Sequence, residues 1–198
     1  MKRTNKRDKL IQVGKEIIVQ QGFNAASLNE ILMAAGIPKG SFYYYFSSKE
    51  DFGLAIINVF AESYQHKLQR ILKDETVSPL TRLRNYFKSG ITDMQNSQCN
   101  DGCLFGNLAQ ELSAQNEIFR DRLKQIFLDW ERAFLECLQS AWEVGEIASN
   151  KDILALAQFI LSGWEGAILQ AKVTKSTIPM ETFVRVLFDL VLTPSNQR

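Results

Sequence analysis

Residues 27–49 read SLNEILMAAGIPKGSFYYYFSSK, and this stretch decides the fold. Ser27 and Glu30 have the spacing of a capping box, which predicts that a short helix starts here. Gly36 lies in a three-residue turn and suits a left-handed backbone. Pro38 is favoured at the first position of a helix, so a second short helix should follow. Two short helices joined by a turn that contains glycine predict a helix-turn-helix, whose second helix enters the major groove of DNA.

The second helix of this motif begins with basic and small residues. Lys39 can reach the O6 and N7 atoms of guanine, or a phosphate. Gly40 and Ser41 are small enough to let the backbone approach DNA closely. Three consecutive tyrosines cannot all face one core, because successive helical residues point about 100° apart. We therefore expect at least one exposed tyrosine hydroxyl, assign Phe42 and Phe46 to the core, and leave Tyr43 open between the two.

The rest of the chain has the apolar period of helices, with no alternating strand and no internal repeat. We expect an all-α protein with nine helices, at about 4–21, 27–35, 38–45, 49–73, 78–94, 102–113, 117–143, 151–173 and 179–192. Residues 1–48 should form a DNA-binding domain and residues 49–198 an effector-binding and dimerisation domain, with helix 49–73 as the bridge. The last two helices are apolar on more than one face, which predicts burial against a second subunit.

Composition narrows the class of protein further. The chain has 198 residues, 45% of them hydrophobic, and a formal net charge of +1. Residues 1–46 hold seven basic and three acidic groups, which is either a nucleic-acid contact or a solvated tail. No apolar run approaches the ~20 residues of a membrane span, and three cysteines read as reduced thiols of a cytoplasmic protein. The chain has a single histidine and no Gly-rich phosphate loop, so we expect neither a metal site nor a cofactor.

Residues 4–52 resemble the DNA-binding domain of the TetR family of repressors. The resemblance rests on the capped helix at Ser27, the turn at residues 35–37, the run GSFYYYF at residues 40–46 and Lys49-Glu50. The family usually has His where this chain has Tyr45, which keeps a phosphate-directed donor. The resemblance implies phosphate contacts from Ser27, Ser41, Tyr44, Tyr45 and Lys49. It implies base contacts from Pro38, Lys39 and Tyr44, together with a homodimer built on the last two helices.

Two fragments of the C-terminal half resemble one subgroup of that family, the electrophile-sensing repressors of the N-ethylmaleimide reductase type. These fragments are DGCL at residues 101–104 and GAILQAK at residues 166–172. The resemblance implies a sensor cysteine at Cys103.

Chemistry gives Cys103 a separate argument. A cap at Asn100 or Asp101 would place Cys103 in the first turn of a helix, where free amides and the helix dipole favour a thiolate. An ionised Asp101 would oppose this, and Lys172 would help if it lies near. The alternative is a small buried hydrophobe, which we expect for Cys137. Four aromatic residues are either an effector pocket or ordinary core: Phe87, Phe105, Trp130 and Trp164.

These patterns predict a cytoplasmic, dimeric DNA-binding repressor that leaves a pseudopalindromic operator when a small molecule binds or a cysteine is modified. Two alternatives stay open. The chain would instead be an all-α enzyme with a reactive thiol, which leaves the helix-turn-helix unexplained, or a transcriptional activator of the same fold.

Overall fold

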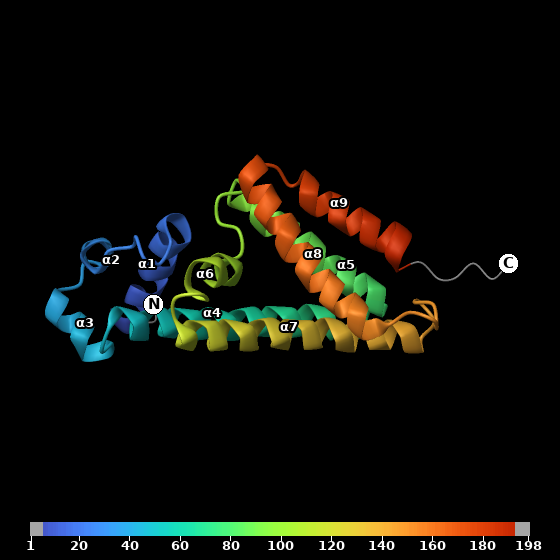
Figure 1. Ribbon diagram of the computed structural model, residues 1–198, viewed down its shortest axis with the longest axis horizontal. Coiled ribbons are helices and arrows are strands. Elements are labelled where there is room, and N and C mark those ends of the chain that lie inside the picture. Colours follow the sequence, from blue (N-terminus) through green and yellow to red (C-terminus); the bar gives the residue numbers. More distant parts are fainter. Residues whose placement is uncertain (1–5, 193–198) are drawn as a thin grey trace. The chain divides into compact units, whose positions relative to one another are not determined.

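The computed structural model describes residues 6–192, and every regular element in that range is helical. The elements are α1 (Lys6–Gln21), α2 (Leu28–Ala35), α3 (Lys39–Tyr45), α4 (Lys49–Leu72), α5 (Pro79–Asn96), α6 (Leu104–Leu112), α7 (Glu117–Glu143), α8 (Ile153–Thr174) and α9 (Ile178–Val186), followed by a π-helical turn at Leu187–Val191 (Figure 1). The all-α prediction is confirmed. The predicted start of the first helix at Thr4, and the basic Lys2 and Arg3, lie outside the described residues.

The chain divides into two compact units. The N-terminal unit contains the described part of residues 1–63 together with residues 104–123. The C-terminal unit contains residues 64–103 and the described part of residues 124–198. Helices α4 and α7 each contribute to both units, and α6 belongs with the N-terminal helices. The predicted domain boundary at residue 49 therefore marks the start of α4, whereas the compact units divide within that helix.

Local signals in the sequence explain where the N-terminal helices begin and end. The Ser27 Oγ accepts a hydrogen bond from the Glu30 amide at 3.1 Å, as the capping box predicts. Gly36 ends α2 with φ of 63°, a left-handed conformation. The Ser48 Oγ accepts from the Asp51 amide at 3.0 Å and caps α4.

Close helix packing builds the core of the N-terminal unit. A Cβ added to Gly14 of α1 would clash with the Phe52 ring of α4, so these two helices approach closely. That ring also packs edge-on against Phe42 of α3, with centroids 5.5 Å apart. These contacts hold α3 against the unit by its aromatic residues and leave the opposite face of the helix to solvent.

Helix α8 carries more apolar surface than the C-terminal unit covers. It is 22 residues long, its mean hydropathy reaches 1.3, and only 28% of that apolar stretch is buried. By length and composition alone it is the one helix in the described range that can cross a membrane. Its Trp164 packs into the core against α5, and α9 lies beside it (Figure 1). Exposed apolar side chains remain on the helix, namely Leu154, Phe159, Leu169 and Val173.

Candidate DNA-binding surface and thiol cluster

Helix α3 presents a polar and aromatic face to solvent. Pro38, Lys39 and Gly40 are exposed at its start. Tyr43 and Tyr44 have 56% and 82% of their surface exposed, whereas Phe42 and Phe46 are buried. The prediction that the phenylalanines form core while a tyrosine stays outside is confirmed, and Tyr43 falls on the exposed side.

The other predicted DNA ligands already have contacts within the protein. Ser27 caps α2, and Ser41 and Tyr45 are half-buried. The Lys49 Nζ donates to the Asn24 carbonyl oxygen at 3.2 Å and lies 4.8 Å from the Phe23 ring centroid. Partial burial lowers the pKa of Lys49, and the nearby Glu111 carboxylate opposes that effect. Lys49 therefore anchors the start of α4 through contacts within the protein, in addition to its predicted phosphate contact.

Cys103 lies directly before α6 and not in its first turn, because the helix starts at Leu104, two residues later than predicted. The reason is a turn that runs on to Gly102, where φ is 69°, after left-handed residues at Gln98 and Cys99. Asn100 was one of two predicted caps, but its Oδ1 accepts instead from the Lys175 Nζ at 2.7 Å. The Cys103 side chain is half-buried.

The Cys103 thiol donates a hydrogen bond to the carboxylate of Glu165 on α8. Burial raises the pKa of Glu165 from its ordinary 4.5 to about 7, and the hydrogen bond from the thiol partly offsets that rise. A carboxyl group that changes charge near neutral pH thus contacts the predicted sensor cysteine.

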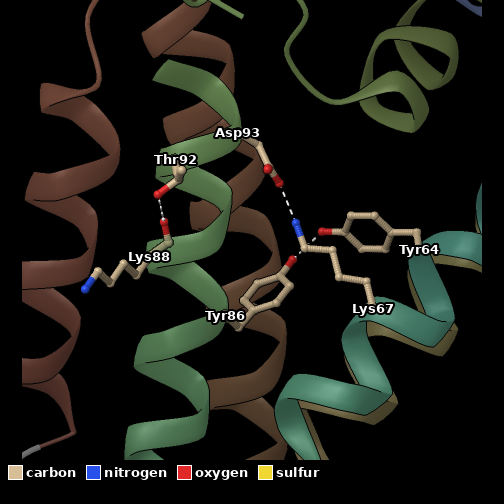
Figure 2. A network of polar contacts seen from close by, with 6 residues as sticks. All are labelled: Tyr64, Lys67, Tyr86, Lys88, Thr92 and Asp93. Atoms are coloured by element: carbon tan, nitrogen blue, oxygen red, sulfur yellow. Dashed lines mark hydrogen bonds and ion pairs between the residues drawn. The ribbon is translucent and has the colours of Figure 1, made fainter. Parts of the chain in front are cut away.

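Two tyrosines complete this cluster. The hydroxyls of Tyr64 on α4 and Tyr86 on α5 are 2.6 Å apart and point toward each other in Figure 2. The Trp164 side chain hydrogen-bonds to Tyr86. Burial raises the pKa of both tyrosines, and the charges of Glu165 and Cys103 raise them further. Helices α4, α5 and α8 and the residue before α6 thus bring four titratable side chains together.

Two lysines contact residues beside the cluster. Lys67 of α4 pairs with Asp93 of α5 beside the tyrosines, while Thr92 donates to the Lys88 carbonyl oxygen within α5 (Figure 2). Lys172 of α8 donates to the Asp101 carbonyl oxygen at 3.4 Å, two residues before Cys103. The structure therefore places Lys172 on the loop that carries the cysteine.

The predicted aromatic set packs as core. The ring centroids of Phe87 and Trp164 are 4.8 Å apart, and those of Trp130 and Tyr64 are 4.5 Å apart. Phe105 is also buried but belongs to the N-terminal unit. A cavity of about 410 Å³ in the C-terminal unit is lined by other side chains of α4, α5, α7 and the loop after α4. Several of them are charged, among them Lys73, Arg82, Arg132 and Glu136, and Cys137 also lines the cavity.

The other two cysteines are buried. The Cys137 thiol donates to the Pro79 carbonyl oxygen at 3.3 Å, and burial raises its pKa to about 11. The prediction that Cys137 is core is confirmed. Cys99 has 5% of its surface exposed. Of the three thiols, Cys103 is the one with both partial exposure and an ionisable partner.

Comparison with known proteins decides the family. Residues 10–56 match the family model described as bacterial regulatory proteins of the tetR family. Residues 79–187 match the model described as the tetracyclin repressor-like C-terminal domain. The chain belongs to the TetR family. It is a DNA-binding transcriptional repressor, as the sequence predicts.

Relatives of this TetR-family chain match it over almost its whole length. The HTH-type transcriptional repressor DhaR of Mycobacterium sp. (strain GP1) is 34% identical, with 100% of this chain and 97% of the relative covered. The HTH-type transcriptional repressor NemR of Escherichia coli K12 is 30% identical, covering 96% and 95%. The crystal structure of the reduced form of E. coli NemR superposes with a TM-score of 0.88 over 96% of this chain and 98% of that one. The predicted resemblance to an electrophile-sensing subgroup is thereby supported.

Sequence reasoning did not find Glu165, Tyr64 or Tyr86. A signal for Glu165 is present, because it is the single acidic residue among the 22 of α8. An isolated carboxylate on an apolar helix is expensive to bury unless it has a partner. The tyrosines fit their amphipathic helices as ordinary core residues, so only their hydrogen bond distinguishes them.

Proposed function

We propose that this repressor binds a pseudopalindromic operator as a homodimer and leaves it when a small molecule binds the C-terminal unit or when Cys103 is modified. The exposed face of α3 is the observation that supports DNA binding. A short helix that buries its phenylalanines and exposes Lys39, Tyr43 and Tyr44 is shaped to lie in a major groove.

The side chains of the helix-turn-helix take two kinds of role in this proposal. Pro38, Lys39 and Tyr44 face base edges, and Gly40 allows close approach of the backbone. The phosphate contacts come from Ser27, Ser41, Tyr44, Tyr45 and Lys49, and the exposed Tyr43 hydroxyl adds another. Because Lys49 already donates to a carbonyl oxygen, its remaining donors serve the phosphate.

Helices α8 and α9 form the dimer interface in this proposal. TetR regulators act as dimers. Here α8 carries exposed Leu154, Phe159 and Leu169, and α9 and the turn after it add Ile178 and Leu190. A twofold axis through these helices holds two α3 helices at successive major grooves, about 34 Å apart.

Release follows from a shift between two dimer conformations. An effector shifts that equilibrium only by binding the conformation with misplaced α3 helices more tightly. The hydrogen-bonded Cys103 and the similarity to NemR support covalent modification as one trigger. A non-covalent effector near Phe87, Trp130 and Trp164 is the other. We further propose that the protein acts in the cytoplasm and catalyses no reaction, as its relatives are transcriptional regulators.

A DNA-release titration tests this proposal. The probe is the DNA flanking the gene, labelled and followed by fluorescence anisotropy while iodoacetamide is added. Wild type should release DNA as Cys103 becomes alkylated, which mass spectrometry follows in parallel. Cys103→Ser should bind DNA normally and resist release.

Cys99→Ser and Cys137→Ser are matched controls and should release like wild type, because both thiols are buried. If Cys103→Ser releases at the wild-type dose, Cys103 is not the sensor. If wild type binds no flanking DNA at all, the proposal is wrong for that operator and that gene.

A further inference from the structure

Glu165 and Cys103 occupy a place where two negative charges are costly. The thiol donates directly to the carboxylate, so the two acids lie within hydrogen-bond distance. Both are at least half-buried, and the neighbouring Tyr64 and Tyr86 are acids as well. Two acidic groups in such contact cannot both ionise near neutral pH, because like charges repel strongly at low dielectric.

We propose that Glu165 is the positioning residue of Cys103: its carboxylate holds the thiol proton in the resting protein and takes that proton when the sulfur bonds to an electrophile. This proposal rests on the proposed role of Cys103 as a sensor. It adds the residue that sets the thiol's reactivity.

The step balances with the groups present. With iodoacetamide, the sulfur forms a bond to the methylene carbon, the carbon–iodine bond breaks and iodide leaves. The thiol proton passes to the Glu165 carboxylate, which becomes neutral in its buried position. The site begins with one negative charge on Glu165 and ends with none, so burial favours the product.

The neighbouring titratable groups either stay protonated or have partners of their own, and Glu165 is the carboxylate that contacts the thiol. Tyr64 of α4 and Tyr86 of α5 stay protonated at neutral pH, because burial raises the pKa of each above its ordinary value. From α4 and α5, Lys67 and Asp93 pair with each other. Lys172 of α8 donates to a backbone carbonyl oxygen. From α7, Trp130 packs on Tyr64 and carries no charge.

The rate of alkylation against pH tests the proposal on the full-length protein. Iodoacetamide modification of Cys103 is followed by mass spectrometry from pH 6 to 9.5 in wild type and in Glu165→Gln. In wild type the rate should rise as Glu165 ionises and then change less than about twofold between pH 7.5 and 8.5. In Glu165→Gln that first rise should disappear. The rate should then climb about fivefold over the same interval, as for an ordinary thiol of pKa about 8.5.

Glu181→Gln, at an exposed carboxylate on α9, is the matched control and should keep the wild-type profile. Circular dichroism checks that both variants are folded. Identical profiles for wild type and Glu165→Gln would overturn the proposal. This readout is independent of DNA: if alkylation of Cys103 follows the predicted profile but leaves DNA bound, the sensor function fails while the role of Glu165 stands.

Discussion

At the scale of single residues, Glu165 couples the stability of the fold to pH. Its pKa is about 7 in the folded protein against an ordinary 4.5, because burial disfavours the ionised form. Between these values the folded chain holds a proton that the unfolded chain has lost. The free energy of unfolding therefore falls as pH rises from about 4.5 to about 7, and the loss is complete above that range.

Replacing Glu165 by Gln should remove this penalty. The free energy of unfolding of Glu165→Gln minus that of wild type should increase by roughly 3 kcal/mol as the pH rises from 4.5 to 8. Urea unfolding at a series of pH values measures the difference. A constant offset between the two proteins across that range would show that the carboxyl does not titrate in the folded state as described.

A substitution at Tyr44 should change DNA binding with almost no effect on stability. It is 82% exposed, so Tyr44→Ala should change the free energy of unfolding by no more than about 0.5 kcal/mol. If it contacts bases, operator affinity should fall by about 1–3 kcal/mol while non-specific binding changes less. Anisotropy titrations with operator and unrelated DNA measure both. Val144→Ala, exposed on the loop after α7, is the control, and equal losses on both DNAs would contradict base contact.

Residue patterns predicted the outward face of α3 well, because burial there follows from helical geometry alone. Phe42 and Phe46 lie four positions apart on one side, and Tyr43 and Tyr44 point elsewhere. The Cys103–Glu165 contact was beyond such reasoning. It joins residues 62 positions apart, and its partners are set by how α8 packs, which no local period encodes.

At the scale of helices, most boundaries were readable, and the start of α6 shows why some were not. Capping residues fixed α2 and α4, since Ser27 and Ser48 bond to amides three positions on. Before α6, Gln98 and Cys99 adopt left-handed conformations that non-glycine residues seldom use. Tertiary contacts, including the Lys175 bond to the Cys99 carbonyl oxygen, hold that loop.

Helix α6 fixes the turn between α1 and α2 through Glu111. Its carboxylate accepts hydrogen bonds from the Phe23 amide at 2.7 Å and the Asn24 amide at 2.6 Å. A Cβ added to Gly22 would lie 3.0 Å from the same carboxylate, so the turn and the side chain fit closely. Cys103, the proposed site of modification, is the residue directly before α6, the helix whose Glu111 holds the turn between α1 and α2.

Glu111→Gln should destabilise the protein by about 1–3 kcal/mol. An amide has one acceptor oxygen, so one backbone donor loses its charged partner and meets an NH₂ group. Thermal unfolding measures the effect, and Glu117→Gln is the control because that side chain is 84% exposed. A change of less than about 0.3 kcal/mol would mean that these two hydrogen bonds add nothing to the fold.

At the scale of the whole molecule, the uncovered apolar side of α8 requires a second surface. The described chain leaves Phe159, Leu169 and Val173 exposed on one helix. A sequence pattern with apolar residues on two sides predicted this, since one side meets the chain's own core and the other needs a partner. Which residues face the partner was not predictable from the period alone. Ile168 is half-buried within the chain, whereas its neighbour Leu169 has 44% of its surface exposed.

Leu169→Glu should therefore break the dimer. A carboxylate placed in an apolar interface lacks a partner and costs several kcal/mol in each subunit. Light scattering should give wild type a mass near twice 22.6 kDa and the variant a mass near 22.6 kDa. The variant should also lose operator binding, because a single α3 reads only half of the site and forgoes the second set of contacts. Val144→Glu adds the same charge at an exposed site outside α8 and α9 and should stay dimeric. A wild-type monomer at micromolar concentration would refute the interface, and a dimeric Leu169→Glu would move it away from this face of α8.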